Sequence, residues 1–401
     1  MKKLLILAIA SSLALAACSG SNKEPEAATQ QQPAAKQEPK LSEAEQLLRS
    51  VPYTEEGLKK MFKSEETMTP VEYEAYLLAF EKCPFKDGIK SDTCPPQKIS
   101  FDVKKLKLDR EEKNKIAFKL LDSKKDIIRY VAASDLDVYP NETDLQIKTF
   151  EYAKKEKHPK VLAELMGEFF EQVPNNDEAR EFVVNHVNDE NTIIRETVAQ
   201  LLSPSEVIGE HPELLETLMT MCTKDTDLAA SFYACQGVGR AHDDSVIPTL
   251  VEILNDPEQA ARHVDITRAL VDMWLNFPRY EHNSKDAYTA YINYLKAKPR
   301  TEAVPAAESL RINSLVDTGD DYKAWQKQAK YFKLKDMIAV YSDIAKDDNA
   351  SISARKLAIE MIADWGTAKD LKALSKPIQA SKAERIEEVQ AQLNESLENK
   401  K

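Results

Sequence analysis

Apolar residues recur at steps of three and four along most of the chain after Leu41. Leu214, Leu218 and Met221 follow this spacing, and residues 386–397 repeat it. Because an α-helix has about 3.6 residues per turn, side chains at these positions share one face and can be buried together. The pattern predicts amphipathic helices throughout the folded part of the chain, and no segment has the alternation of a convincing strand.

Turn-forming residues separate the helical runs. The clearest breaks are Pro140-Asn141, Pro174-Asn175-Asn176, Ser203-Pro204-Ser205 and Asn255-Asp256-Pro257. Proline interrupts a helix, whereas Asp, Asn and Ser side chains cap the first turn of the next one. We therefore predict an all-α fold built as a succession of helical hairpins.

Three helical segments share a sequence pattern, which indicates internal repeats. Residues 122–136, 189–202 and 347–362 each begin with an acidic residue, carry an arginine in the first or second turn, and continue with small or apolar residues. The arginines are Arg129, Arg195 and Arg355. The first two lie 66 residues apart, which corresponds to two units of 33, and repeats of this length are typical of stacked helical pairs.

Residues 225–254 form the clearest unit, which resembles the HEAT-like repeat of bacterial proteins. The positions that match are Gly237, Gly239, Asp244, Ile247, Pro248 and Leu250. The resemblance implies an all-α, HEAT-like α-solenoid of stacked helical hairpins, with another helical repeat or an irregular helical domain as the alternatives. It also implies that the repeated arginines pair with acids of adjacent turns and set the register between units.

The N-terminus has a different apolar pattern. Met1-Lys2-Lys3 precedes an uncharged block, residues 4–17, which is shorter than the about 20 apolar residues of a membrane-spanning helix and is typical of an export signal. The block ends in Leu15-Ala16-Ala17-Cys18, which resembles the lipobox of bacterial lipoproteins. The resemblance implies cleavage before Cys18, acylation of Cys18 and attachment to a membrane by lipid.

The residue after the cysteine bears on location. Ser19 stands where an aspartate would, by resemblance to enterobacterial sorting, indicate retention in the inner membrane. We therefore expect the bacterial cell envelope, with the periplasmic face of the outer membrane favoured over the inner membrane. A Gram-positive surface lipoprotein is the other alternative.

The segment that follows cannot build a core. Residues 19–40 contain no Val, Ile, Leu, Met or aromatic residue, so burial cannot offset chain entropy and we predict a disordered tether. The predicted organisation is a lipoprotein signal peptide (1–17), a lipid anchor and disordered linker (18–41), an N-terminal helical region (42–120), HEAT-like repeats (121–280), and C-terminal helical repeats with a capping helix (281–401).

The charge balance limits the kinds of partner. The chain carries 55 Lys plus Arg against 67 Asp plus Glu, a net charge of −12, and removal of Lys2 and Lys3 with the signal changes it to −14. Such a surface repels phosphate backbones and anionic lipid. We therefore predict no nucleic-acid partner, and contact with a membrane only through the lipid.

Four further cysteines form two candidate pairs. Cys83 and Cys94 bracket a loop-like stretch, where a disulfide is favoured over two free thiols or a metal pair. Cys222 and Cys235 are harder to assign, because Cys235 would lie roughly 12 Å along the second helix of a hairpin. A disulfide needs Cα atoms within about 7 Å. Only an offset hairpin would allow it, so buried free thiols and a bond both stay open.

The remaining polar residues predict no catalytic or metal site. The six histidines form no HExxH motif or close pair, and we expect them at the surface or in turns; they are His158, His186, His211, His242, His263 and His282. Gly237-Val238-Gly239 lacks a third glycine, and the acidic residues 317–321 lack the ligand spacing of a calcium loop. We predict no metal and no small-molecule cofactor.

These observations favour a non-catalytic protein-interaction scaffold anchored in the bacterial envelope. The alternative is an envelope enzyme, a lyase or hydrolase built on a helical repeat. For a scaffold, we expect residues 205–220 and 245–255 to contact another envelope protein with a basic face. Glu216 and Glu252 are the positions chosen to test that contact.

Overall fold

The computed structural model describes residues 41–62, 67–86, 89, 93–99, 108–275, 283–297 and 329–400. Helices and turns account for these residues, and no strand occurs among them, as the hydrophobic pattern predicts. Several predictions concern residues outside this description: the signal peptide, the linker, Cys18, His282 and the acidic residues 317–321.

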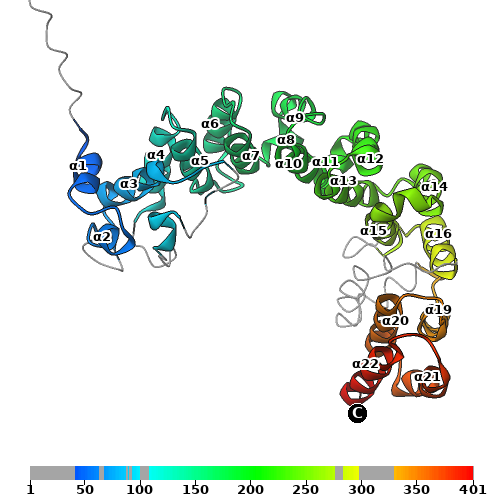
Figure 1. The fold of residues 1–401 in the computed structure, drawn as a ribbon. Helices are drawn as coiled ribbons and strands as arrows, with labels where there is room; N and C mark the ends of the chain where they lie inside the picture. The colour runs from blue at the N-terminus through cyan, green and yellow to red at the C-terminus, as the bar shows by residue number, and fades with distance from the viewer. Residues whose placement is uncertain are drawn as a thin grey trace, which may run out of the picture. The chain divides into compact units, whose positions relative to one another are not determined.

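The helices follow one another along the described parts of the chain (Figure 1). The first are α1 (Glu43–Arg49), α2 (Glu55–Lys59), α3 (Pro70–Ala79), α4 (Arg110–Leu120), α5 (Asp126–Ser134), α6 (Thr143–Ala153), α7 (Pro159–Glu168), α8 (Gln172–Asn175), α9 (Asp177–Val184) and α10 (Thr192–Leu202). The later ones are α11 (Ser205–Glu210), α12 (Leu215–Lys224), α13 (Leu228–Arg240), α14 (Ile247–Asn255), α15 (His263–Trp274), α16 (Lys285–Lys296), α19 (Leu334–Lys346), α20 (Ile352–Trp365), α21 (Ala368–Ala380) and α22 (Ile386–Asn399). Short 3₁₀ helices are η1 (Phe80–Lys82), η2 (Pro95–Lys98), η4 (Pro212–Leu214), η5 (Asp244–Val246) and η6 (Pro257–Arg262).

The predicted breaks are helix boundaries. The Asn176 side chain accepts hydrogen bonds from two backbone N–H groups in the first turn of α9, and Asn191 and Asp227 cap α10 and α13 in the same way. These caps satisfy N–H groups that have no partner inside the helix. Residues 225–254 form α13, a turn at His242 with φ 52°, η5 and α14, so the two predicted helices of this unit are confirmed.

The helices pack mainly on near neighbours in the chain. A row of helices, which we call the central row, consists of α5, α7, α10, α13 and α15, and each member packs on the next. Other helices pack beside this row: α4 on α5, α6 on α7, α12 on α13, and α14 on α15 and α16 (Figure 1). The contacts are thus local in sequence, which is typical of folds built from consecutive helical pairs.

One apolar core continues along most of the chain. It includes Phe150, Leu218 and Trp274, and its described members extend from Met68 to Leu393. A smaller core lies at the N-terminal helices around Leu58. Residues Glu43–Lys401 form one compact unit, and the predicted boundaries at residues 120 and 280 stay predictions.

Two glycines let the central row pack closely. A Cβ at Gly239 of α13 would lie 2.7 Å from the Cβ of Asp272 and 2.8 Å from the carbonyl oxygen of Ala269, both on α15. A Cβ at Gly237 would lie 2.9 Å from Leu218 on α12. The contacts at Gly239 involve a backbone oxygen and a Cβ that cannot move aside, so glycine is needed where α13 meets α15, whereas the end of the Leu218 side chain could shift to relieve the contact at Gly237.

Candidate functional site

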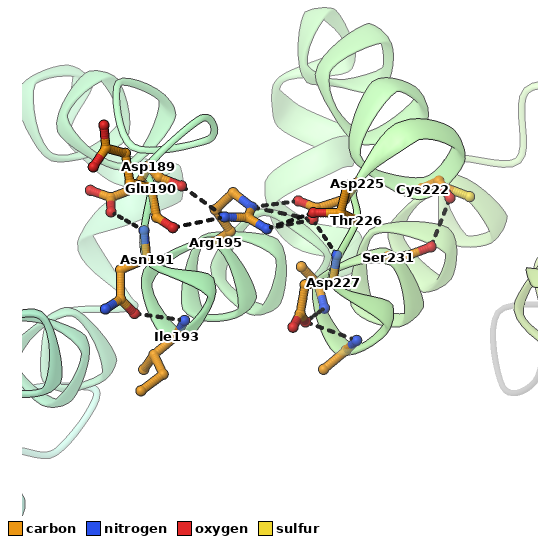
Figure 2. A network of polar contacts seen from close by, with 12 residues as sticks. Asp189, Glu190, Asn191, Ile193, Arg195, Cys222, Asp225, Thr226, Asp227 and Ser231 are labelled. Carbon is orange, nitrogen blue, oxygen red and sulfur yellow. Dashed lines mark hydrogen bonds and ion pairs between the residues drawn. The ribbon is translucent and has the colours of Figure 1, made fainter. Parts of the chain in front are cut away.

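Arg195 links two successive members of the central row. It lies on α10, and its guanidinium donates to both carboxylate oxygens of Asp225, with Nε–Oδ2 and Nη2–Oδ1 distances of 2.9 Å (Figure 2). Its Nη1 also donates to the carbonyl oxygen of Asp189 at 2.8 Å, in the turn before α10. Asp225 stands in the turn before α13. One side chain therefore joins the turns that begin two neighbouring helices.

Arg129 makes the same connection one step earlier. From α5 it donates to both carboxylate oxygens of Glu156, at 2.7 and 2.8 Å, and its Nη1 reaches the carbonyl oxygen of Ser123 at 3.0 Å. Glu156 stands in the turn before α7. The prediction that these arginines pair with acids of adjacent turns is confirmed at both positions.

The two links match residue by residue. Arg129 and Arg195 each stand four residues after the N-cap of their helix, Lys125 and Asn191. Each binds a carboxylate that stands two residues before the N-cap of the next helix in the row. That carboxylate also accepts a hydrogen bond from the backbone N–H of this N-cap, at 2.8 Å in both cases. The same geometry recurs because the turns before α7 and α13 place their carboxylates at the same position relative to the N-cap.

The hydrogen bonds also set the charge state of the acids. Burial acts to raise the pKa of Asp225, but the hydrogen bonds from Arg195 and from the backbone outweigh it, and the pKa lies below its ordinary value. The same balance lowers the pKa of Glu156 beside Arg129. Both acids are therefore ionised near neutral pH, as a bidentate pair with arginine requires.

The position in α13 that corresponds to these arginines is Ser231, and an arginine from further along the chain supplies the missing group. Arg262, at the end of η6, donates to the carbonyl oxygen of Asp225 and to Ser231 Oγ, the latter at 2.7 Å. It also donates to the carbonyl oxygen of Cys222 at 3.1 Å. Sequence reasoning missed Arg262 because it lies outside the repeated pattern.

Both cysteine pairs lie at disulfide distance. The Cα atoms of Cys83 and Cys94 are 5.1 Å apart, and those of Cys222 and Cys235 are 4.7 Å apart. For Cys222 and Cys235, which the sequence left open between a bond and free thiols, this distance favours the bond. Cys235 lies level with the last turn of α12, where its Sγ also contacts the carbonyl oxygen of Cys222 at 3.6 Å. The hairpin is thus offset enough for a bond.

Arg355 differs from the other two repeat arginines. It is fully buried on α20, four residues after the N-cap Ser351. Its Nη1 pairs with Asp348 at 3.1 Å in the turn before α20, and its Nε donates at 3.0 Å to the carbonyl oxygen of Ala345 in the last turn of α19. Arg355 thus pairs with an acid of an adjacent turn, but that turn precedes its own helix, whereas Arg129 and Arg195 pair with the turn before the next helix of the central row.

The two positions proposed for partner contact are accessible. Glu216 lies on α12 and Glu252 on α14, and both are exposed. The helices belong to the set that packs beside the central row. The two carboxylates are therefore available at the surface, on helices that flank α13 and α15.

A groove of about 850 Å³ lies between α4 and α6. At one end Arg110 binds both carboxylate oxygens of Glu142 at 2.5 Å and stacks 4.1 Å from the ring centroid of Tyr139. Deeper along it, Lys148 Nζ lies 3.9 Å from the ring centroid of Phe118. Sequence reasoning missed the groove because its residues are ordinary surface charges contributed by two helices.

Buried acids cluster near the end of α5. Burial, together with the charge of Asp137, raises the pKa of Asp135 to about 7, and burial raises the pKa of Glu168 on α7 to about 7. Lys113 Nζ lies 4.0 Å from Asp135, and burial lowers the pKa of this lysine. Because the pKa values of Asp135 and Glu168 are raised in the folded state, the free energy of unfolding depends on pH through these two acids.

One histidine departs from the expected surface or turn position. His263 is 5 % exposed, and its Nε2 lies 3.0 Å from the carbonyl oxygen of Ile253 and 3.1 Å from that of Asp256. Its Nδ1 lies 3.2 Å from the hydroxyl of Tyr294. The ring joins the turn after α14 to α16, which is a structural role. Across the described parts of the chain, no group of three or more His, Cys, Asp or Glu side chains is arranged to hold a metal ion.

None of the described helices is long and apolar enough to span a bilayer. A comparison of the sequence with protein-family models and with curated proteins finds no match.

Proposed function

We propose that the chain is a lipid-anchored, HEAT-like α-solenoid that acts as a non-catalytic scaffold for another protein of the bacterial cell envelope. The observation that carries the proposal is the repeated link from Arg129 to Glu156 and from Arg195 to Asp225. A link that recurs at equivalent positions supports units stacked in one register. Stacked units build an extended surface, which is the usual basis of binding by helical repeats.

The proposed lipid anchor and envelope location rest on the lipobox, Leu15-Ala16-Ala17-Cys18. One acyl chain binds a bilayer only weakly, whereas two or three hold a protein there stably. Replacing Cys18 with Ala should abolish acylation and leave the protein unprocessed or soluble in the envelope. If the variant still sediments with membranes and has the mature mass of the wild type, the lipoprotein proposal fails.

The binding role rests on the exposed carboxylates of Glu216 and Glu252 and on a mature net charge of −14. We propose that α12 and α14 contact a partner with a basic face, through Glu216 and Glu252 among others. Cross-linking in intact cells should yield one defined adduct, and the adduct should weaken in Glu216→Lys and Glu252→Lys variants. An adduct that is unchanged in both variants rejects this surface as the contact.

The control variant is Glu395→Lys on α22, where the replaced carboxylate is equally exposed but lies outside the proposed contact. Its adduct should equal that of the wild type. Turnover of a substrate by the purified protein without its partner would reject the scaffold proposal in favour of the envelope enzyme.

A further inference from the structure

Two neighbouring helices of the central row expose apolar side chains at their first turns. Leu228 on α13 is 51 % exposed and Val264 on α15 is 37 % exposed. One helical turn further on stand Phe232 and Arg268, each four residues after its exposed neighbour and therefore on the same face of its helix. The two helices pack on each other, so these four side chains belong to one surface.

Contacts between the helices hold this surface together. The guanidinium carbon of Arg268 lies 4.4 Å from the ring centroid of Phe232, which is a cation–π contact. The rings of Phe232 and Tyr233 meet edge to face with centroids 5.0 Å apart. We call Leu228, Phe232, Tyr233, Val264 and Arg268 the α13–α15 patch.

Arg268 differs from the other residues of this patch because its N–H donors have no acceptor among the described residues. Within the described residues, no carboxylate or carbonyl accepts a hydrogen bond from it; its neighbour is the face of Phe232. Burial lowers the pKa of Arg268, which shows that the guanidinium is partly removed from water. Other partly buried arginines of the chain, such as Arg129 and Arg195, donate hydrogen bonds to carboxylates.

The nearest acid on the same helix does not neutralise Arg268. Asp265 is 8 % exposed, and burial raises its pKa to about 6, although Arg268 and Arg262 act in the opposite direction. No ion pair within 4 Å joins Asp265 to Arg268. Within the described part of the chain, the Arg268 guanidinium therefore lies against the Phe232 ring and donates to no protein acceptor.

We propose that the α13–α15 patch binds a segment of another protein in which a carboxylate stands next to aliphatic or aromatic side chains. The carboxylate accepts two hydrogen bonds from Arg268, and the apolar side chains cover Leu228 and Val264. Aromatic residues and arginine dominate the binding energy of protein interfaces, and carboxylate is the anion whose geometry fits a guanidinium. The inference rests on the proposed binding role but concerns a surface separate from Glu216 and Glu252.

The test uses two synthetic peptides and the full, lipidated chain in detergent micelles. The peptides are identical except that a central Asp, flanked by Leu and Phe, is replaced by Asn in the second. Fluorescence anisotropy should show the Asp peptide binding about tenfold more tightly than the Asn peptide, which corresponds to one charge-assisted pair. In Arg268→Gln the two peptides should bind equally. The control Arg385→Gln, at the exposed N-cap arginine of α22, should keep the tenfold difference.

A second variant tests the apolar part. Leu228→Ser should weaken both peptides and leave the ratio between them unchanged, and thermal melts should show that both variants remain folded. Absence of binding by either peptide, equal binding of the two by the wild type, or a tenfold difference that survives in Arg268→Gln would each overturn the proposal. None of these results would alter the outcome of the cross-linking at Glu216 and Glu252, so the two proposals fail separately.

Discussion

Arg195 and Asp225 form a bidentate pair that joins the start of α10 to the turn before α13, and Arg129 repeats this pair with Glu156 at the equivalent positions. The side chains of Arg195 and Asp225 are 12 % and 5 % exposed. Each arginine thus joins one helix of the central row to the turn before the next helix of the row.

Arg195→Ala should lower the free energy of unfolding by about 2–4 kcal/mol, because it leaves the buried Asp225 carboxylate without its main partner. Urea unfolding measures this loss. The matched control is Arg385→Ala, which breaks an exposed pair with Glu388 and should change stability very little. Equal effects of the two substitutions would contradict a structural role for the link.

Gly239→Ala should destabilise the protein by about 1–3 kcal/mol, because the added methyl group would overlap α15. Gly209→Ala is the control, since a Cβ there meets nothing within 4 Å and alanine favours the helix. Thermal melts should therefore move in opposite directions. A neutral result at Gly239 would show that α13 and α15 are not packed so closely.

Stability should increase as the pH falls from 7 towards 5 through the acids at the end of α5. The pKa values of Asp135 and Glu168 are raised to about 7, so the folded state holds these protons more tightly than the unfolded state. Their contribution is complete below the ordinary carboxyl pKa and is lost as the pH rises to about 7.

The comparison of wild type with an Asp135→Asn, Glu168→Gln double variant isolates this contribution. Melting temperatures measured between pH 5 and 7 should slope less steeply with pH in the double variant. Glu142, whose pKa is lowered to about 2, changes charge well below this window. Parallel slopes would show that the two acids titrate normally.

Mass spectrometry without reduction should find Cys83 linked to Cys94 and Cys222 linked to Cys235 in protein taken from cells. The loops are short, with sequence separations of 11 and 13 residues, and each bond should contribute about 3 kcal/mol on the chain-entropy model. Reduction should therefore lower the melting temperature. Free alkylation of all four thiols before reduction would refute both bonds.

The sequence predicts the parts of this fold that depend on local pattern. Caps and turns use a small set of residue types. The sequence therefore predicts the breaks at Asn176 and Asp256 and the equivalent positions of Arg129 and Arg195. The use of Arg262 in place of Ser231 could not be predicted, because its partner turn lies 37 residues earlier in the chain. The bond between Cys222 and Cys235 depended on the offset of a hairpin, which spacing alone does not define.

The exposed side chains of α13 in the α13–α15 patch likewise could not be predicted from the sequence. Leu228 and Phe232 have the spacing of core residues, and only the packing of α10, α12 and α15 around the other faces leaves them at the surface. The sequence around Arg268 likewise contains no motif that sets this arginine apart from the other arginines of the chain. Residues of this kind become candidates only when their surroundings are known.

Purification of the native protein from mild detergent, with quantitative mass spectrometry of the proteins that accompany it, tests the central claim most directly. The account predicts one envelope protein at a constant ratio, released as salt rises from low to physiological strength, because exposed charge pairs are screened over about 8 to 10 Å. A protein that purifies alone at low salt, gives no adduct in intact cells and turns over a substrate would contradict it.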